Sequence, residues 1–266
     1  MKGALHIFLI VLFSSLLLCC TNPESAQKYT IGFSQCTGGD AWRRQMIIDM
    51  RGELAFHPEI SLEYKDAENS SERQIKDIEY FIEKKVDLLI VSPNEADPIT
   101  PVVEKAFENG IPVIVVDRKT SSSMYSAYIG ANNYEIGKLA GTYIADLLEG
   151  KGSILEIWGL HGSSPAIDRH RGFSEVLSKH PGIKITSEIN GKWELDTAKS
   201  QMRKALPSLP HFDLVFAHND IMAYGAHVVC KELKPQNEIM FVGIDALPGP
   251  IAGIQFVDDE GGPGRQ

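Results

Sequence analysis

Short apolar runs alternate with segments of helical periodicity along most of the chain. Residues 86–91 form an apolar run that is too short for a helix and is typical of a strand buried on both faces. In residues 99–107 apolar side chains recur at helical spacing, and Gly110 follows as a stop signal. Residues 111–116 are a second apolar run. This order predicts a strand, a helix and a parallel strand in one sheet.

The same unit returns near the C-terminus. In residues 212–246 an apolar strand is followed by Asn219 and Asp220, then by a helix, and then by a strand that ends at Asp245. The corresponding residues of the first unit are Asn94, Glu95 and Asp117. Because ligands of open sheets bind beyond the carboxyl ends of the strands, the repeat predicts two similar lobes that present polar groups to a shared cleft.

The remaining chain follows the same alternation. Further strands are predicted at residues 29–34, 61–65, 128–130, 153–158 and 183–189, and further helices at residues 42–54, 72–85, 133–148, 165–179 and 194–206. Strands that alternate with helices indicate the α/β class, with parallel sheets and helices on both faces. We expect lobe one to comprise residues 28–120 and lobe two to comprise residues 121–250, with the strand at residues 128–130 near the crossing.

The N-terminal segment has the composition of an export signal. Lys2 precedes an apolar run that extends to Cys20, so residues 1–25 are predicted to be a signal peptide or a membrane anchor. The pair Cys19-Cys20 also resembles a lipoprotein signal, in which a cysteine is acylated. We therefore expect a periplasmic location, with anchoring or lipidation as alternatives. Residues 251–266 are polar and rich in glycine, which predicts a partial return segment and a disordered tail.

Composition excludes some partners. The net charge of the 266-residue chain is −9, and the sequence shows no stripe of Lys and Arg. Nucleic acid is therefore not an expected partner, because phosphate binding needs clustered basic residues. Cys36 and Cys230 fall in different predicted lobes, so no disulfide is expected between them.

Polar side chains gather at the predicted strand ends. Carboxylates only accept hydrogen bonds, arginine only donates them, and asparagine does both. This mixture suits a ligand with several hydroxyl groups, such as a small sugar. Tryptophan side chains offer apolar faces for the C–H side of a sugar ring. The candidate ligand-binding residues are Gln35, Asp40, Trp42, Asp117, Arg118, Arg169, Trp193, Asn219 and Asp245.

Each candidate also has a purely structural explanation. Asp117 would cap a turn, and Asn219 would cap the helix that follows it. Trp42 has the helical spacing of a core residue, and Trp193 precedes a helix at a position where a hydrophobic staple is common. Arg169 lies in a run of charged side chains that would face solvent. The joint placement of these residues at strand ends is what favours a binding site.

Enzyme signatures are weak. His161 lies near Ser163, but no G-x-S-x-G turn surrounds them. The sequence has neither a G-x-G-x-x-G motif after the first strand nor a Walker loop, so no cofactor is expected. Its histidines show no metal-ligand spacing, so no metal is expected. An exported carbohydrate hydrolase that uses Asp117 and Asp245 as a carboxylate pair is the alternative of another class.

Four motifs in order resemble the type I periplasmic binding proteins, in particular their ribose-binding branch. The motifs are IPVIVVDR, DRHRGF, AHNDIMAYGA and FVGIDA, and the resemblance covers residues 29–254. It implies two α/β lobes that close on a sugar. In that family an Asp-Arg pair after a strand of lobe one binds sugar hydroxyls, which corresponds to Asp117 and Arg118. The resemblance places the other hydroxyl-binding positions at Arg169, Asn219 and Asp245, and the aromatic positions at Trp193 and Trp42.

Two segments also resemble the extracytoplasmic input domains of hybrid two-component sensor kinases. These are GGDAWRRQM and SPNEADPITPVVEKAFENGIPVIVVDR. The resemblance implies a sensory role for a chain that is not itself an enzyme, with a sensor kinase as partner. The solute-binding component of a sugar ABC transporter, with the membrane component as partner, is the alternative. The family continues past the strand-end Asp with further elements, so the resemblance also predicts that lobe one is C-terminally truncated.

Overall fold

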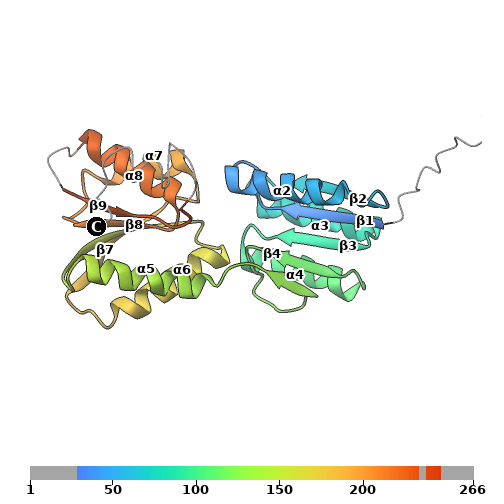
Figure 1. Cartoon of the computed structure of the whole chain (residues 1–266), viewed down its shortest axis with the longest axis horizontal. Helices are drawn as coiled ribbons and strands as arrows, with labels where there is room; N and C mark the ends of the chain where they lie inside the picture. The colour runs from blue at the N-terminus through green and yellow to red at the C-terminus, as the bar shows by residue number, and fades with distance from the viewer. Residues whose placement is uncertain (1–28, 234–237, 247–266) are drawn as a thin grey trace, which may run out of the picture.

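Two lobes lie end to end in the protein, as Figure 1 shows. The computed structural model describes residues 29–233 and 238–246. Each lobe is a parallel sheet with helices on both faces, which confirms the predicted α/β class and two-lobed architecture. The predicted segments 1–25 and 251–266, and the truncation predicted at the C-terminus, lie outside the described residues.

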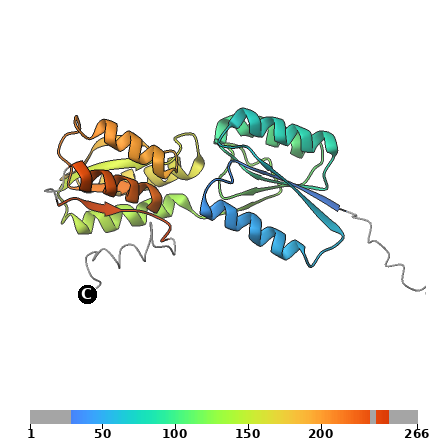
Figure 2. The same cartoon turned by 90° about the horizontal axis from the view of Figure 1, so that it is seen from above.

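Lobe one is built on a five-stranded sheet with the order β2-β1-β3-β4-β5. Its strands are β1 (Tyr29–Gln35), β2 (Ile60–Asp66), β3 (Leu88–Ser92), β4 (Val113–Val116) and β5 (Ala127–Ile129). Helix α2 (Ala41–Leu54) covers one face of this sheet. Helices α3 (Ser71–Lys84) and α4 (Ala96–Glu108) cover the other face (Figure 2).

The two faces of this sheet bury separate apolar clusters. Between the sheet and helices α3 and α4, the side chains of Phe81, Leu89 and Ile99 are fully buried. On the opposite face, Phe33 packs with Ile47 of α2. Burial on both faces accounts for the continuous apolar character of β3 and β4 in the sequence.

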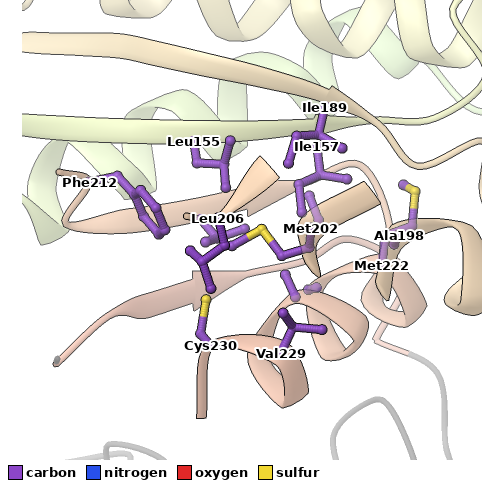
Figure 3. Close-up of a cluster of buried hydrophobic side chains, with 14 residues drawn as sticks. Leu155, Ile157, Ile189, Ala198, Met202, Leu206, Phe212, Met222, Val229 and Cys230 are labelled. Atoms are coloured by element: carbon purple, nitrogen blue, oxygen red, sulfur yellow. The ribbon is translucent and has the colours of Figure 1, made fainter. Parts of the chain in front are cut away.

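Lobe two is built on a four-stranded sheet with the order β7-β6-β8-β9. Its strands are β6 (Gly152–Trp158), β7 (Ile183–Asn190), β8 (Leu214–Ala217) and β9 (Met240–Val242). Helices α5 (Asn133–Leu147) and α6 (Ser164–Leu177) pack on one face through a cluster that includes Ile144, Phe173 and Phe216. Helices α7 (Leu195–Ala205) and α8 (Asp220–Leu233) pack on the other through the cluster drawn in Figure 3.

Glycines bring the backbones of α5 and α6 together. A Cβ at Gly137 would collide with the main-chain oxygen of Arg169, and a Cβ at Gly172 would collide with that of Tyr134. This close contact fixes the position of Arg169 relative to the first turn of α5, where Asn133 lies. The packing of the two helices therefore places polar groups at one end of lobe two.

Strand β5 shows where lobe one ends. It pairs in parallel with β4, so the sheet of lobe one extends to Ile129. Lobe one therefore continues past the boundary predicted at residue 120. A strand of only three residues carries too little periodicity to be assigned to either sheet from the sequence. The described chain enters lobe two through residues 130–132.

The repeated unit is present in both lobes. β3, α4 and β4 form it in lobe one, and β8, α8 and β9 form it in lobe two, with parallel pairing in each case. Cys36 of lobe one and Cys230 of lobe two are both buried side chains. Among the described residues, the helices all lack the length and apolar content that a membrane span requires.

Candidate functional site

A cavity of about 550 Å³ lies between the lobes, at the carboxyl ends of their strands. This volume is within the range of small-molecule binding sites. Both repeated units contribute to it, since Asp117 follows β4 of lobe one and Asp245 follows β9 of lobe two. Of the candidates from the sequence, those that line the cavity are Asp40, Trp42, Asp117, Arg118, Arg169, Trp193, Asn219 and Asp245.

Gln35 is the candidate that does not line the cavity. It is the last residue of β1, between β2 and β3, and its side chain is fully buried. Its Nε2 donates to the main-chain oxygen of Arg43 at 3.4 Å, so it lies beneath helix α2. The strand is one residue longer than predicted, which keeps Gln35 inside the lobe instead of at its edge.

Arg43 is a cavity residue that the sequence analysis missed. It is 5% exposed, and its Nη2 donates to Asp117 Oδ2 at 2.6 Å while its Nη1 donates to Ser92 Oγ at 2.9 Å. Asp40 caps α2 by accepting from the main-chain N–H of Arg43 at 2.8 Å. Arg43 thus fixes the Asp117 carboxylate in the cavity wall, and the Asp40 cap holds the start of the helix that carries Arg43.

Arg118 is buried next to Asp117. It is 3% exposed, and its Nη1 donates to the main-chain oxygen of Asn94 at 2.8 Å. Its guanidinium lies 5.9 Å from the ring centre of Trp193, which belongs to the other lobe. Burial lowers the pKa of Arg118 below its ordinary value, because a charged group is less stable away from water. The carboxylate of Asp117 pairs with Arg43 of helix α2 and not with the neighbouring Arg118.

Arg169 has the corresponding place in lobe two. Its Nε donates to Asn133 Oδ1 at 2.9 Å, its Nη1 donates to the main-chain oxygen of His218, and its Nη2 lies 3.7 Å from Asp245 Oδ1. The guanidinium is 5.4 Å from the ring centre of Trp193. Arg169 faces the cavity and not solvent, so the charged run around it in the sequence was a misleading signal. Asn133 was also missed, and its place at a helix start after the crossing was the available signal.

Asn219 has both of the roles considered for it. Its Oδ1 accepts from the main-chain N–H of Met222 at 3.0 Å, which caps helix α8, and the residue also lines the cavity.

Trp42 is 44% exposed at the cavity, so it is not a core residue. Trp193 donates from Nε1 to Ser163 Oγ at 3.1 Å, which fixes its indole in the cavity wall.

Asp245 has an unusual protonation equilibrium. Burial raises the pKa of Asp245 to about 7, although the nearby Arg169 opposes this shift. A partner that donates hydrogen bonds to this carboxylate would favour its charged form. The cavity therefore contains an acid whose charge is sensitive to what binds there.

Three residues of the cavity lining have a positive φ angle, as do several residues elsewhere in the described chain. The φ angles of Asp117, Trp193 and Asp245 are 61°, 69° and 113°, in a region that side chains other than glycine rarely adopt. Such strain persists only where the surrounding structure holds it, and it is common at binding sites. It favours a role for these residues in binding a ligand.

A buried acid, Glu156, stabilises the part of lobe two that holds Arg169. Glu156 is fully buried and accepts from His218 Nε2 and His170 Nδ1, both at 2.9 Å. Burial by itself would raise the pKa of Glu156, but these hydrogen bonds hold it below its ordinary value. This network fixes the main chain of His218, which is the acceptor for Arg169. Within residues 29–233 and 238–246, no three His, Cys, Asp or Glu side chains are grouped to hold a metal ion.

Comparison with known proteins identifies the family. The model of the periplasmic binding protein domain matches residues 31–260. The galactofuranose-binding protein YtfQ of Escherichia coli K12 is 32% identical over 248 residues, which cover 90% of this chain and 78% of that protein.

Two solved structures share the fold. The fructose-binding periplasmic domain of the hybrid two-component system BT1754 is 46% identical with a TM-score of 0.83, over 87% of this chain and 77% of that one. The binding protein of an arabinose ABC transporter from Shewanella sp. ANA-3, solved with L-arabinofuranose, is 32% identical with a TM-score of 0.69, over 76% and 68%. None of these three relatives is described as an enzyme. The sequence resemblance is thus confirmed, and this chain belongs to the periplasmic binding protein domain family.

Proposed function

We propose that this protein binds a neutral sugar in its furanose form between the two lobes, as the extracytoplasmic sensory domain of a signalling system. The observation that carries the proposal is the set of polar side chains that line the cavity from both lobes. Asp117 and Arg118 of lobe one face the same space as Arg169, Asn219 and Asp245 of lobe two. A ligand that contacts both sets would favour the closed arrangement, because it gains contacts there that an open arrangement does not offer.

The charges of the cavity favour a neutral ligand. Its charged lining consists of three carboxylates, Asp40, Asp117 and Asp245, and three guanidinium groups, Arg43, Arg118 and Arg169, so the formal charges cancel. A charged ligand would leave a buried charge without compensation, which is unfavourable. A polyhydroxylated ligand instead matches the alternating donors and acceptors, while apolar lining residues such as Trp42 and Met46 suit its C–H faces.

The relatives support the furanose form. The three named above are described with fructose, galactofuranose and L-arabinofuranose. A furanose ring is more compact than a pyranose ring and carries part of its hydroxyl pattern on an exocyclic chain. Arg118 of lobe one and Arg169 of lobe two both lie near the indole of Trp193, so the shape of the ring that fits between the lobes would depend on these three side chains.

The sensory role rests on similarity to the domain from the hybrid two-component system. Transport is the second candidate, because a relative with 32% identity serves an ABC transporter. Deletion of the gene from the organism that carries it distinguishes the two. A sensory role predicts that the transcriptional response to the sugar is lost while its uptake is unchanged. Loss of uptake would instead support the transporter.

Methyl glycosides test the ligand class, since their rings are locked. We expect titration calorimetry to detect binding of methyl furanosides of fructose, galactose or arabinose. The methyl pyranosides of the same sugars should bind at least about tenfold more weakly, a difference of about 1.4 kcal/mol. Binding of the pyranosides alone would refute the furanose assignment, and steady release of methanol would support the hydrolase instead.

Asp117→Asn tests the cavity as the binding site. Loss of a charged acceptor costs about 1.5–3 kcal/mol, so affinity for the sugar should fall by about 10- to 150-fold in calorimetry. The control is Asp49→Asn, because Asp49 lies on the exposed side of α2, away from the cavity, and accepts a hydrogen bond from Gln45 of the same helix. Unchanged affinity in Asp117→Asn would place the sugar elsewhere.

The raised pKa of Asp245 predicts pH-dependent binding. Since the pKa of Asp245 is about 7 and hydroxyl donors favour its charged form, binding should release a proton near neutral pH. The affinity should therefore rise from pH 6 to pH 8, by up to about tenfold for each pH unit below 7. Calorimetry in buffers of different ionisation enthalpy measures the released proton. Asp245→Asn should remove this dependence, and an affinity that rises toward acid pH would contradict the assignment.

A further inference from the structure

The turn after β6 connects the cavity wall to lobe one. Residues 159–164, the β6 turn, run from the end of β6 to the start of α6. It contains His161 and Ser163, which lie close together in the sequence without the surrounding turn of a hydrolase. None of Gly159, Gly162, Ser163 and Ser164 belongs to the described lining of the cavity.

One side of the β6 turn holds Trp193. Ser163 is fully buried, accepts from Trp193 Nε1 at 3.1 Å and donates to the main-chain oxygen of Leu160 at 2.6 Å. Gly159 lies against the indole, and a Cβ there would collide with the ring. The backbone of Trp193 is strained, with a φ of 69°, so its position depends on contacts of this kind.

The other side of the β6 turn contacts lobe one. The main-chain N–H of Ala96 donates to Gly162 O at 2.8 Å, and the main-chain N–H of Lys119 donates to Ser164 Oγ at 2.6 Å. These donors follow β3 and β4, next to the elements that carry Arg118.

Gly162 lies against the side chain of Glu95 of lobe one. A Cβ at Gly162 would lie 2.5 Å from Glu95 Oε1 and 2.9 Å from Glu95 Cγ. Glu95 would have to move to accept a methyl group there, and its Oε2 accepts from Ser71 Oγ at 2.7 Å in the present position. A methyl group at position 162 therefore disturbs the contact between the lobes at this point.

We propose that the β6 turn is a latch that sets sugar affinity without touching the sugar. It holds Trp193 in the cavity wall and at the same time joins lobe two to lobe one, so Gly162 and Ser164 act as positioning residues. The proposal rests on the proposed sugar binding. When the binding-competent closed state is only partly populated, the observed affinity falls in proportion to that population. Loss of the latch should thus weaken binding, because it lowers the population of the closed state.

Binding kinetics test the latch, with D-fructose as the ligand and tryptophan fluorescence in stopped flow as the signal. In Ser164→Ala the dissociation rate should rise by about fivefold, the effect of one net hydrogen bond, and in Gly162→Ala by at least as much. The association rate and the melting temperature of the sugar-free protein should stay unchanged, which separates a latch from a general loss of stability.

Matched controls remove the same groups elsewhere. Gly52→Ala adds a methyl group where nothing lies within 4 Å, and Ser178→Ala removes an exposed hydroxyl that donates to Glu175 O. Both should dissociate from D-fructose at the rate of the unaltered protein. Unchanged dissociation rates in Gly162→Ala and Ser164→Ala would overturn the latch.

A crosslink tests the contact without any sugar. In the variant Glu95→Cys with Gly162→Cys, the thiol at position 95 would lie near the Cβ at position 162, as a disulfide requires. Mild oxidation should form an interlobe disulfide, detected by peptide mass mapping, and Glu95→Cys with Gly52→Cys should form none. Absence of the first crosslink would overturn the latch. If it forms while the unaltered protein binds no furanose, the proposed ligand is wrong and the contact stands.

Discussion

Three buried arginine side chains need hydrogen-bond acceptors, and this need determines how the residues around the cleft are arranged. Arg43, Arg118 and Arg169 are each no more than 9% exposed, so every one of them needs acceptors that replace water. Arg43 finds Asp117 and Ser92, Arg118 finds the main chain of Asn94, and Arg169 finds acceptors on three separate segments of lobe two. These requirements fix the strand ends of both lobes and leave the remaining donors directed at the cavity.

The same arrangement explains why strained backbone is tolerated. Asp117, Trp193 and Asp245 have positive φ angles, which are unfavourable for residues with a side chain. Each is held by a partner outside its own strand, namely Arg43, Ser163 and Arg169. Contacts within the protein thus hold these residues in place, and side chains held in this way lose less entropy when a ligand binds. The β6 turn extends this organisation from the cavity wall to the contact between the lobes.

The sequence predicted most of the polar residues that line the cavity, because strand ends can be located from apolar runs. Asp117, Asn219 and Asp245 follow such runs directly, and parallel strands bring their carboxyl ends to one edge of a sheet. Arg43 escaped notice because it lies inside a helix, where position along the chain does not reveal which face meets the cleft. Gln35 was misplaced because β1 continues one residue further than predicted, so its side chain packs beneath α2 instead of following the strand end.

Local pattern thus determined the α/β class, the repeated units and the chemistry of the strand-end residues, since these depend on neighbours in the sequence. Only the tertiary structure decided which charges pair, which residue of each helix reaches the cavity, and that β5 completes the sheet of lobe one. Arg43 and Asp117 are 74 positions apart, and Trp193 and Ser163 are 30 apart. Contacts of that kind arise from the packing of whole lobes, and no local periodicity encodes them.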